Sequence, residues 1–481
     1  MITIDEMAVF CKKKGFVYSS SEIYGGMSGF WDYGPLGVEL FNNIKAHWWK
    51  HFVQSREYML GLDASIISHP KTWKASGHID SFSDVSIICK KCKKVNKVDK
   101  ADVGQVKCEF CSGELDETTM KELKLLFTTE VGAENPIKSY LRGETAQGMF
   151  LDFKIITDTC RIKLPFGIAQ IGKCFRNEIA PRDFTFRSRE FTIAEFEFFI
   201  HPFEKKCDIL DREHLDVELR LLDAETQDAG KTDLKKSTIG KMLEEGRLDE
   251  WHAFWLSEQL MWFKSLGLNM DKIKIREHKK SELSFYSSAT FDMDYEYPFG
   301  SKEVAGNANR GQYDLNQHIK ESKKDLSIFD EKTNSKIIPR VIEPTFGMDR
   351  LFLVVIVDSY HDDKERGNIV LRLSPNLAPI KVAVFSLVNK LNDKARDVYL
   401  LIKNEFYCSF DTSGSIGRRY ARSDEIGTPF CVTVDFDTET DGSVTIRDRD
   451  TTAQVRVKVK DLKDVLRKLI NQEIKFEELK K

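Results

Sequence analysis

The segment 168–200 constrains the fold most, because two runs of alternating residues are joined there by a polar loop. Strict alternation of apolar and polar residues is typical of strands, and two such runs around a polar connection predict an antiparallel hairpin. Successive side chains of a strand point to opposite faces of the sheet. One face of the predicted hairpin is therefore apolar, and the other carries Arg176, Glu178, Glu195 and Glu197.

The charged face of this hairpin needs a partner, because charges inside a sheet are costly to desolvate unless they are paired or meet a ligand. For any single arginine and glutamate, a structural salt bridge is the alternative explanation. The whole set favours a ligand: Phe191 can stack on a flat base, and Arg176 can bind a phosphate through two hydrogen bonds. Arg187 and Arg189, in the loop, can reach terminal phosphates. The hairpin predicts a site for a bent nucleoside triphosphate.

A second set of candidate residues lies downstream, in EPTFGMDRLFLVVIV. Glu343 is expected to end a strand, Gly347 to start the next element, and the run LFLVVIV to form a buried helix, since it is apolar on all sides. Arg350 in its first turn can cover an adenine ring or meet the γ-phosphate. Glu303 offers a hard oxygen ligand for Mg²⁺. For Arg350 and Glu303 taken singly, an ordinary surface salt bridge is the alternative.

Four of the ten cysteines are spaced as a metal-binding set: Cys89, Cys92, Cys108 and Cys111. The spacing CxxC-x15-CxxC is typical of four thiolates that converge on one tetrahedral zinc ion. A closed set of four thiolates leaves no position for substrate, so the sequence predicts a structural Zn²⁺. The alternative is four unrelated buried thiols. Lysines cluster around the quartet, which indicates either contact with phosphate or a solvated face.

The composition limits the class of protein. A chain of 481 residues is long enough for two or three domains. The formal net charge of -3 gives no global basic field, so any nucleic-acid partner must be held by local patches. No apolar run approaches the roughly 20 residues that span a bilayer, and the N-terminus shows no signal pattern. A cytoplasmic protein without membrane contact or a disulfide framework is expected.

The remaining chain contains further segments for which helices or strands are expected. Helical spacing is seen at 7–13 and 36–52, on either side of a glycine-rich connector. A short strand is expected to end at Pro70 and to be followed by a loop, and 203–268 reads as helical and highly charged. From about Pro379 strands and helices alternate, which predicts a separate α/β domain of roughly 100 residues.

Several of these segments resemble class II aminoacyl-tRNA synthetases, and specifically the homodimeric glycyl-tRNA synthetases. DASIISHP resembles the dimer-interface motif, FRNE with FRSREF the second motif, and GMDR before an apolar helix the third. WDYGPLG, SGHID, ETAQGMF, GIAQIGKCFRNEI, ANRGQYDL and EPTFGMDR resemble further segments of that family. The C-terminal domain resembles the anticodon-binding module shared by the glycine, histidine, threonine and proline enzymes.

The resemblance implies an α+β fold with an antiparallel-sheet class II catalytic domain over residues 1–375 and an α/β anticodon-binding domain over 376–481. The catalytic domain would carry a zinc-knuckle insertion at about 86–116 and a helical insertion at about 203–285. The implied activity is that of a glycine–tRNA ligase, which uses ATP with Mg²⁺ to form glycyl-adenylate and then charges tRNA(Gly). A homodimer is implied as well.

The resemblance also implies functional residues. Arg176, Arg350 and Glu303 would be catalytic. ATP would contact Arg176, Asn177, Glu178, Phe186, Arg187, Ser188, Arg189, Glu190, Phe191, Glu303, Val304, Gly347, Met348, Asp349 and Arg350. Glycine would contact Glu144, Phe191, Thr192, Ile193, Ala194, Glu195, Arg310, Glu343, Pro344, Thr345, Phe346 and Gly347. The chain departs from the family pattern at Gly143, where a proline is usual, and at Lys97, the nearest counterpart of a usual arginine.

Other functions remain as alternatives. One is a class II synthetase for proline, threonine or histidine. Another is a catalytically inactive, synthetase-like accessory subunit of a polymerase, which should lack the phosphate-binding arginines; Arg176, Arg189 and Arg350 are all present. A zinc-knuckle RNA-binding protein without activity would explain the cysteines but not the charged hairpin.

Overall fold

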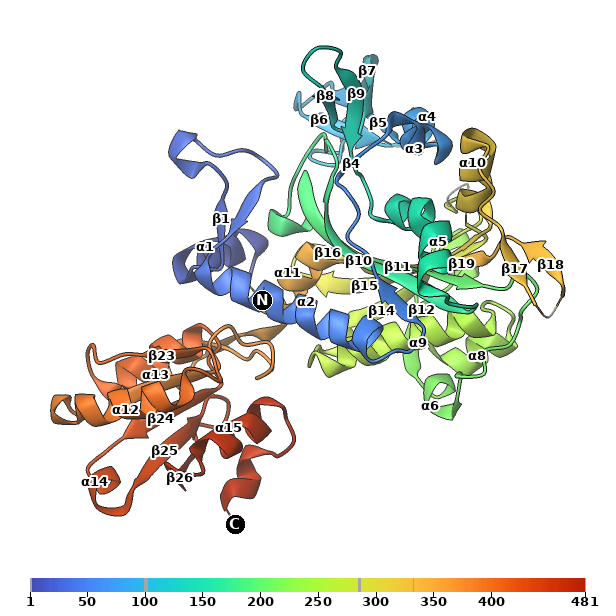
Figure 1. Cartoon of the computed structure of the whole chain (residues 1–481). Helices are drawn as coiled ribbons and strands as arrows, with labels where there is room; N and C mark the ends of the chain where they lie inside the picture. The colour runs from blue at the N-terminus through green and yellow to red at the C-terminus, as the bar shows by residue number, and fades with distance from the viewer. Residues whose placement is uncertain (1, 99–102, 284–286, 332, 481) are drawn as a thin grey trace.

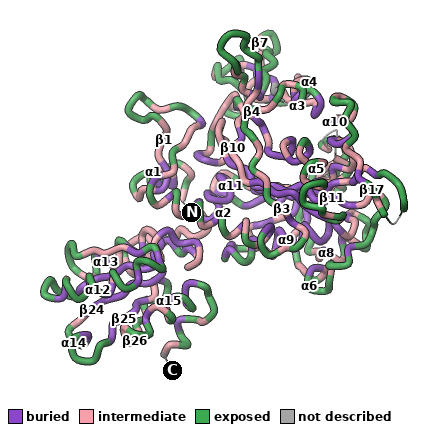
Figure 2. The backbone as a smooth tube through the Cα atoms, in the orientation of Figure 1, coloured by how far each residue is buried: buried purple, intermediate pink, exposed green. Residues whose placement is uncertain are grey.

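The computed structural model describes residues 2–98, 103–283, 287–331 and 333–480, which form a larger N-terminal part and a smaller C-terminal domain (Figure 1). Residues 99–102 of the predicted zinc segment and 284–285 of the predicted helical insertion lie outside the described residues. Many of the buried residues lie in the central part of each of the two parts (Figure 2). The combination of helices with largely antiparallel sheets confirms the α+β class.

A nine-stranded sheet forms the centre of the larger part, in the order β13-β12-β14-β15-β16-β19-β11-β10-β3. Its strands are β3 (Met59–Gly61), β10 (Phe166–Phe175), β11 (Glu190–Ile200), β12 (Glu218–Leu222), β13 (Lys235–Thr238), β14 (Ile273–Glu277), β15 (Ala289–Tyr297), β16 (Gly300–Gly311) and β19 (Arg340–Gly347). Neighbours are antiparallel except in the pairs β10–β3 and β12–β14. The predicted hairpin is confirmed as β10 and β11, with Gln170 opposite Glu195 and Cys174 opposite Phe191.

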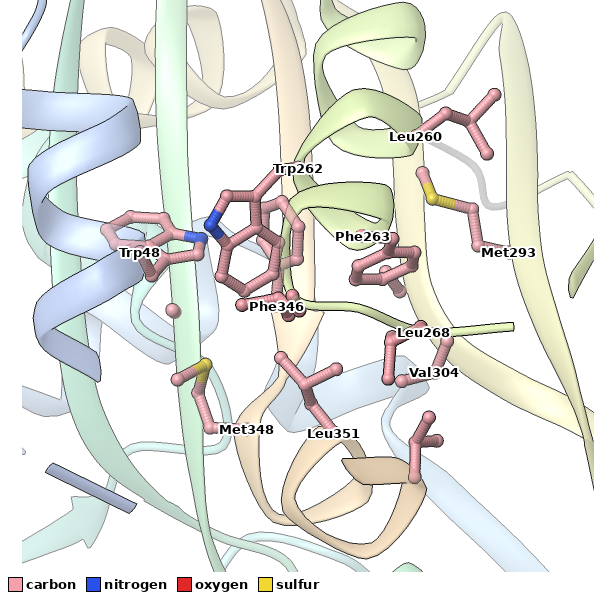
Figure 3. Close-up of a cluster of buried hydrophobic side chains, with 14 of the residues drawn as sticks. Trp48, Leu260, Trp262, Phe263, Leu268, Met293, Val304, Phe346, Met348 and Leu351 are labelled. Atoms are coloured by element: carbon pink, nitrogen blue, oxygen red, sulfur yellow. The ribbon is translucent and has the colours of Figure 1, made fainter. Parts of the chain in front are cut away.

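Helices cover both faces of this sheet. The larger core includes residues of α1 (Ile4–Lys14), α2 (Pro35–Trp49), α9 (Glu250–Ser265) and α11 (Met348–Ser359). Trp48 of α2, Trp262 of α9 and Phe346 of β19 meet in it (Figure 3). A smaller core lies against α5 (Ala146–Cys160) and α10 (Tyr313–Ser322). The helices predicted at 7–13, at 36–52 and in LFLVVIV are confirmed as α1, α2 and α11.

The prediction that residues 203–268 are helical is correct in part. The segment contains four helices, but two strands between them, β12 and β13, extend the central sheet. In VELRLL, Leu219 and Leu221 are buried at alternate positions, which is the period of a strand. The helices are α6 (Arg212–Leu215), α7 (Ala224–Asp228), α8 (Ile239–Glu244) and α9.

One shorter prediction also needs correction. Pro70 does not lead into a loop but is the first residue of α3 (Pro70–Ala75), which is followed by α4 (His78–Ser81). Proline fits the first turn of a helix because its missing N–H would have no partner there. The short strand before it is β4 (Ile67–Ser68). The glycine-rich connector contains β2 (Trp31–Tyr33), which pairs with β1 (Val17–Ser19).

Smaller sheets surround the central one. The cysteine segment forms a three-stranded sheet of β5 (Ser83–Cys89), β6 (Val95–Val98) and β7 (Leu115–Lys124). A second three-stranded sheet joins β4, β8 (Thr128–Val131) and β9 (Ile137–Leu141). Two-stranded sheets are formed by β17 (Ile328–Asp330) with β18 (Ser335–Ile337) and by β20 (Tyr360–Asp363) with β21 (Asn368–Leu371).

The C-terminal domain has a five-stranded sheet in the order β23-β22-β24-β25-β26. Its elements are β22 (Val382–Ser386), α12 (Asn392–Ile402), β23 (Cys408–Phe410), α13 (Ile416–Glu425), β24 (Phe430–Val434), α14 (Asp437–Asp441), β25 (Ser443–Asp448), β26 (Gln454–Lys458) and α15 (Leu462–Ile470). This confirms the predicted alternation of strands and helices. None of the helices in the described part of the chain has the length and apolar character needed to cross a membrane.

Candidate active site

The β10–β11 hairpin has one apolar and one polar face, as its alternation predicts. Ala194, Phe196 and Phe198 lie in the large core. Glu195 and Glu197 point to the reverse face, where both are buried. Buried carboxyl groups are expensive unless they are paired, protonated or bound to a ligand, so this face of the sheet is the candidate site.

Arg176 directly follows β10 on the polar face. Its Nε donates to the carbonyl oxygen of Gly143 at 3.1 Å, and its guanidinium lies 5.4 Å from the ring centroid of Phe191 and 5.2 Å from that of Phe82. Within the described residues, no carboxylate pairs with Arg176 and its two terminal nitrogens have no hydrogen-bond partner. These nitrogens are therefore available to bind an anion beside an aromatic ring.

The loop arginines hold the loop itself. Arg187 donates from Nε and Nη2 to one carboxylate oxygen of Glu178, at 2.8 Å in each case. Arg189 donates to the carbonyl oxygens of Glu178, at 3.1 Å, and Ser28, at 2.9 Å. For Arg187, the structure therefore shows the salt bridge that the sequence left as the alternative.

Arg350 and Glu303 contact one another, as the alternative reading of the sequence expects. Arg350 Nη1 lies 3.1 Å from Glu303 Oε2 and also donates to the Glu303 carbonyl oxygen at 3.1 Å. The Arg350 guanidinium lies 4.6 Å from the centroid of the Phe186 ring. About half of the Glu303 side chain is exposed (48%), so the pair lies at the surface of the site and remains open to a ligand.

Four of the predicted contact residues have side chains in the large core. These are Ala194, Val304, Phe346 and Met348. The core lies on the face opposite Glu195, so these residues can reach a ligand only through their backbone atoms.

Asp349 is turned inward as well. Its Oδ1 accepts from the Tyr33 hydroxyl at 2.6 Å, and its Oδ2 accepts from the backbone N–H of Thr192 at 2.5 Å. Burial raises the pKa of this carboxyl group above its ordinary value. Asp349 therefore joins the start of α11 to β11 and does not contribute a charge to the open face.

The other predicted residues have the following places. The N–H of Asn177 donates to the Leu125 carbonyl oxygen at 2.8 Å, and Glu190 pairs with Lys173 at 3.2 Å. Ile193 and Ser188 are buried. β19 does not end at Glu343 but continues through Pro344 to Gly347, which is the N-cap of α11. This corrects the expected end of the strand, since Pro344 is paired with Asn307 across the sheet.

Acidic side chains with little solvent exposure gather around Arg310, itself only 2% exposed. Arg310 donates from Nε and Nη2 to the two carboxylate oxygens of Asp314, at 2.8 and 2.9 Å. Its Nη1 donates to Glu343 Oε1 at 2.6 Å, and its Nη2 lies 4.0 Å from Glu144 Oε1. The predicted glycine contact Arg310 is thus a buried counter-ion that organises the acidic cluster.

Glu144 and Glu195 are each held from two sides. Glu144 Oε2 lies 3.2 Å from His78 Nε2. Glu195 Oε1 accepts from the backbone N–H of Thr145 at 2.8 Å and also from its hydroxyl, while Oε2 accepts from the Thr345 hydroxyl at 3.3 Å. Thr145, the residue after Glu144, and Thr345 thus hold the two oxygens of the Glu195 carboxyl group.

The charge states of the cluster differ from one carboxyl group to the next. Burial alone would raise the pKa of Glu144, but the neighbouring His78 and Arg310 outweigh it and hold this pKa below its ordinary value. Burial, with the charge of Glu144, raises the pKa of Glu195. Burial raises the pKa of Glu343 to about 8, although Arg310 opposes this. A cation entering the cluster would meet one firmly ionised carboxylate and others that ionise readily in its presence.

Further residues that hold these carboxyl groups were not predicted as site residues. They include His78, Thr145, Gln147, which donates to Glu144 at 2.9 Å and Asp314 at 3.0 Å, and Asp314 itself. All four lie in segments that carry the family resemblance: SGHID, ETAQGMF and ANRGQYDL. The sequence therefore identified these segments, but it gave a role only to those residues that match a contact residue of the family.

The four predicted cysteines converge. Their Sγ atoms lie within 4.8 Å of one another, with Cys89 and Cys111 at 3.6 Å and Cys92 and Cys108 at 3.5 Å. This confirms the clustering that the spacing predicts. Between two of the cysteines, Glu109 forms an ion pair of 2.6 Å with Arg182 of the hairpin loop, so the cysteine segment contacts the site.

The cavities place the loop arginines at an open surface. Cavities of about 310 Å³ and 450 Å³ lie on either side of the loop, and Arg182 and Arg187 line both. A larger cavity of about 1050 Å³ lies between α9 and strands β12–β14, and none of its lining residues belongs to the predicted site.

Known proteins are similar to this chain along almost its whole length. A glycine–tRNA ligase of Caldanaerobacter subterraneus subsp. tengcongensis is 42% identical over 99% of both chains. Those of Geobacillus thermodenitrificans and Clostridium perfringens are 42% and 41% identical, over 97% of this chain and 98% of each relative. Residues 381–469 match the family model of an anticodon binding domain.

Proposed function

The chain belongs to the glycine–tRNA ligase family, and on that premise we propose that its central sheet activates glycine with ATP and transfers it to tRNA(Gly). In the first step, a carboxylate oxygen of glycine attacks the α-phosphorus of ATP and pyrophosphate leaves. In the second, a ribose hydroxyl at the 3′ end of the tRNA attacks the adenylate carbonyl carbon and AMP leaves. Neither step needs a side-chain nucleophile, so the protein acts by positioning and by stabilising charge.

One observation supports this assignment above the others. Arg176, whose terminal nitrogens have no hydrogen-bond partner in the described part of the chain, and the carboxylates of Glu144 and Glu195 lie beside the same hairpin face. An arginine can stabilise the charge that develops on the α-phosphate, and carboxylates suit the ammonium group of an amino acid. Phe191, under the Arg176 guanidinium, offers a ring on which adenine can stack. Arg350 and Phe186 would close the other side of the nucleotide.

Magnesium would bind with the phosphates near Glu303. Glu303 pairs across the sheet with Asp294, so two carboxyl groups lie on neighbouring strands. Carboxylate oxygens together with phosphate oxygens are the ligands that Mg²⁺ prefers. When bound, the ion would offset phosphate charge and orient the leaving pyrophosphate. The residues present therefore fit the ion.

Selection of glycine must rest on exclusion, because a pocket gains only about 1–3 kcal/mol per methylene and cannot attract the smallest substrate best. We expect Thr345, beside Glu195, to form part of the excluding wall. Replacing Thr345 by alanine should raise the activation of alanine relative to glycine by about tenfold, since it removes both the methyl and the hydroxyl group from the wall. Pyrophosphate exchange with each amino acid measures the ratio; Thr345→Ser should keep the hydroxyl contact to Glu195. An unchanged ratio in Thr345→Ala would place the wall elsewhere.

The cysteine cluster fits a structural zinc ion. Its four sulfur atoms are close enough to share one ion, and thiolates are the ligands that structural zinc sites use. Cys92→Ser should lower bound zinc from about one ion per chain to a small fraction, because three thiolates bind more weakly than four. Elemental analysis of the purified protein measures this. Cys160→Ser, at an exposed position, is the matched control. Equal zinc content in both variants would show that these cysteines are not the ligands.

The remaining partners follow from the family. We propose that the anticodon-binding domain at the C-terminus recognises the anticodon arm of tRNA(Gly). The lysines near the cysteines would contact phosphates of the same tRNA. A homodimer in the cytoplasm is proposed on the family resemblance. We propose that the catalytic domain spans residues 1–375 and the anticodon-binding domain residues 376–481. The catalytic domain would contain the zinc-binding insertion at about 86–116 and a second insertion at about 203–285.

Pyrophosphate exchange with each standard amino acid in turn tests the proposed function. We expect exchange with glycine alone. Exchange with proline, threonine or histidine would support the rival synthetases. Absence of exchange with every amino acid, together with binding of tRNA, would support an inactive synthetase-like protein.

A further inference from the structure

Glu197 of β11 and Glu343 of β19 lie opposite one another on neighbouring strands of the central sheet. The β11–β19 register pairs Glu195 with Thr345 and Phe198 with Ile342, which places Glu197 opposite Glu343. Residues directly opposite on antiparallel strands point to the same face, with β-carbons about 5 Å apart. Two like charges in that position repel one another, so the pair is unstable with both carboxyl groups ionised.

Glu197 has none of the partners that its neighbours have. Glu197 is 0% exposed, and neither of its carboxyl oxygens has a hydrogen-bond partner among the described residues. Its other cross-strand neighbour is the aliphatic Ile168. Arg310 instead donates to Glu343 and to Asp314. Because a buried carboxylate without a counter-ion or donor is very costly, this position favours the neutral acid.

We propose that Glu197 is a neutral carboxylic acid that shares its proton with Glu343 and thereby positions Glu343 for the ammonium group of glycine. This deepens the proposed function and rests on it. Glu197 acts through Glu343 and does not touch the substrate, so it is a positioning residue. A neutral acid can donate a hydrogen bond, as an ionised one cannot. The proton also reduces the surplus of negative charge around Arg310.

Glycine binding should then release a fraction of a proton per chain from the Glu197–Glu343 pair. Burial raises the pKa of Glu197 well above its ordinary value and that of Glu343 to about 8. An incoming ammonium group favours the ionised form of the acids that face it, so a proton leaves the pair. The charged groups that act on the pair are Glu195 of β11, Arg310 of β16, Asp314 of α10 and Glu144 before α5. The titratable groups next to these are His78 of α4, beside Glu144, and His318 of α10, near Asp314 and Arg310.

Two variants of similar size separate the proposal from a merely structural role. Glu197→Gln keeps a neutral donor and should leave the KM for glycine within about threefold of the wild type. Glu197→Leu removes the donor and should raise the KM for glycine about tenfold while leaving the KM for ATP unchanged. If Glu197→Gln raises this KM as much as Glu195→Gln does, Glu197 acts as a charge and the proposal fails. An unaltered KM in Glu197→Leu would mean that Glu197 only fills space, and the proposal also fails.

Two readouts concern the proton directly. Infrared difference spectra of the wild type against Glu197→Gln should contain the carbonyl stretch of a protonated carboxyl group, whether or not glycine is the substrate. Calorimetry of a nonhydrolysable glycyl-adenylate analogue, in buffers of different ionisation enthalpy, should show proton release that Glu197→Gln diminishes. Absence of the infrared band overturns the inference even if glycine exchange is normal. Absence of glycine exchange in the wild type, with the band present, overturns the proposed function alone.

Discussion

Arg176→Ala is expected to lower kcat/KM for glycine-dependent pyrophosphate exchange by about a hundredfold or more. Arg176 is held by one hydrogen bond from Nε to Gly143, while its terminal nitrogens have no partner among the described residues. A preorganised donor aimed at developing charge typically contributes about 3 kcal/mol to the transition state. Because Arg176 neutralises no buried carboxylate in the described structure, its removal should cost activity and not stability.

Exchange kinetics, together with thermal unfolding of the same preparations, measure both effects. The matched control is Arg340→Ala. Arg340 is the first residue of β19 and pairs with Asp249 at 2.8 Å, away from the proposed phosphate site. That variant should keep normal exchange. Near-normal exchange in Arg176→Ala would remove Arg176 from the phosphate site. A loss of exchange accompanied by a large fall in the unfolding temperature would give it a structural role instead.

The hairpin could be predicted from the sequence because its pattern is local. Alternation over ten residues fixes which side chains share a face, and the structure places Gln170 and Glu195 on the same face, opposite one another. The same holds for LFLVVIV, which is predicted as a buried helix because it is apolar on all sides. The cysteine spacing also sufficed, because two short knuckles bring their own ligands together.

The acidic cluster could not be predicted in the same way, because its geometry is set by contacts between distant segments. Arg310 is 166 positions from Glu144 along the chain, yet the two side chains approach to 4.0 Å. Nothing local distinguishes the buried pair of Arg310 and Asp314 from an ordinary exposed pair at helical spacing. β12 was missed for a related reason, since a strand of five residues inside a charged segment carries a weak signal.

Arg310→Met is expected to destabilise the protein by about 3–5 kcal/mol near pH 8, because it leaves buried carboxylates without their counter-ion. Glu343 and Asp314 both lose direct hydrogen bonds in this variant. The pKa of Glu343 is raised from 4.5 to about 8 while Arg310 opposes the rise, and it should climb further without Arg310. Between those pH values the folded state binds more protons than the unfolded state, so stability falls as pH rises. The fall should be steeper in Arg310→Met.

Unfolding midpoints of the wild type and Arg310→Met between pH 5 and pH 9 check this. The difference should be smallest at pH 5, where the unpaired carboxyl groups are protonated in the folded protein, and should grow towards pH 9. Arg340→Met is the matched control, since its partner Asp249 is 31% exposed and water can solvate that carboxylate when the arginine is lost. The effect of this variant should change little with pH. A difference for Arg310→Met that stayed constant with pH would show that the loss comes from packing and not from unpaired charge.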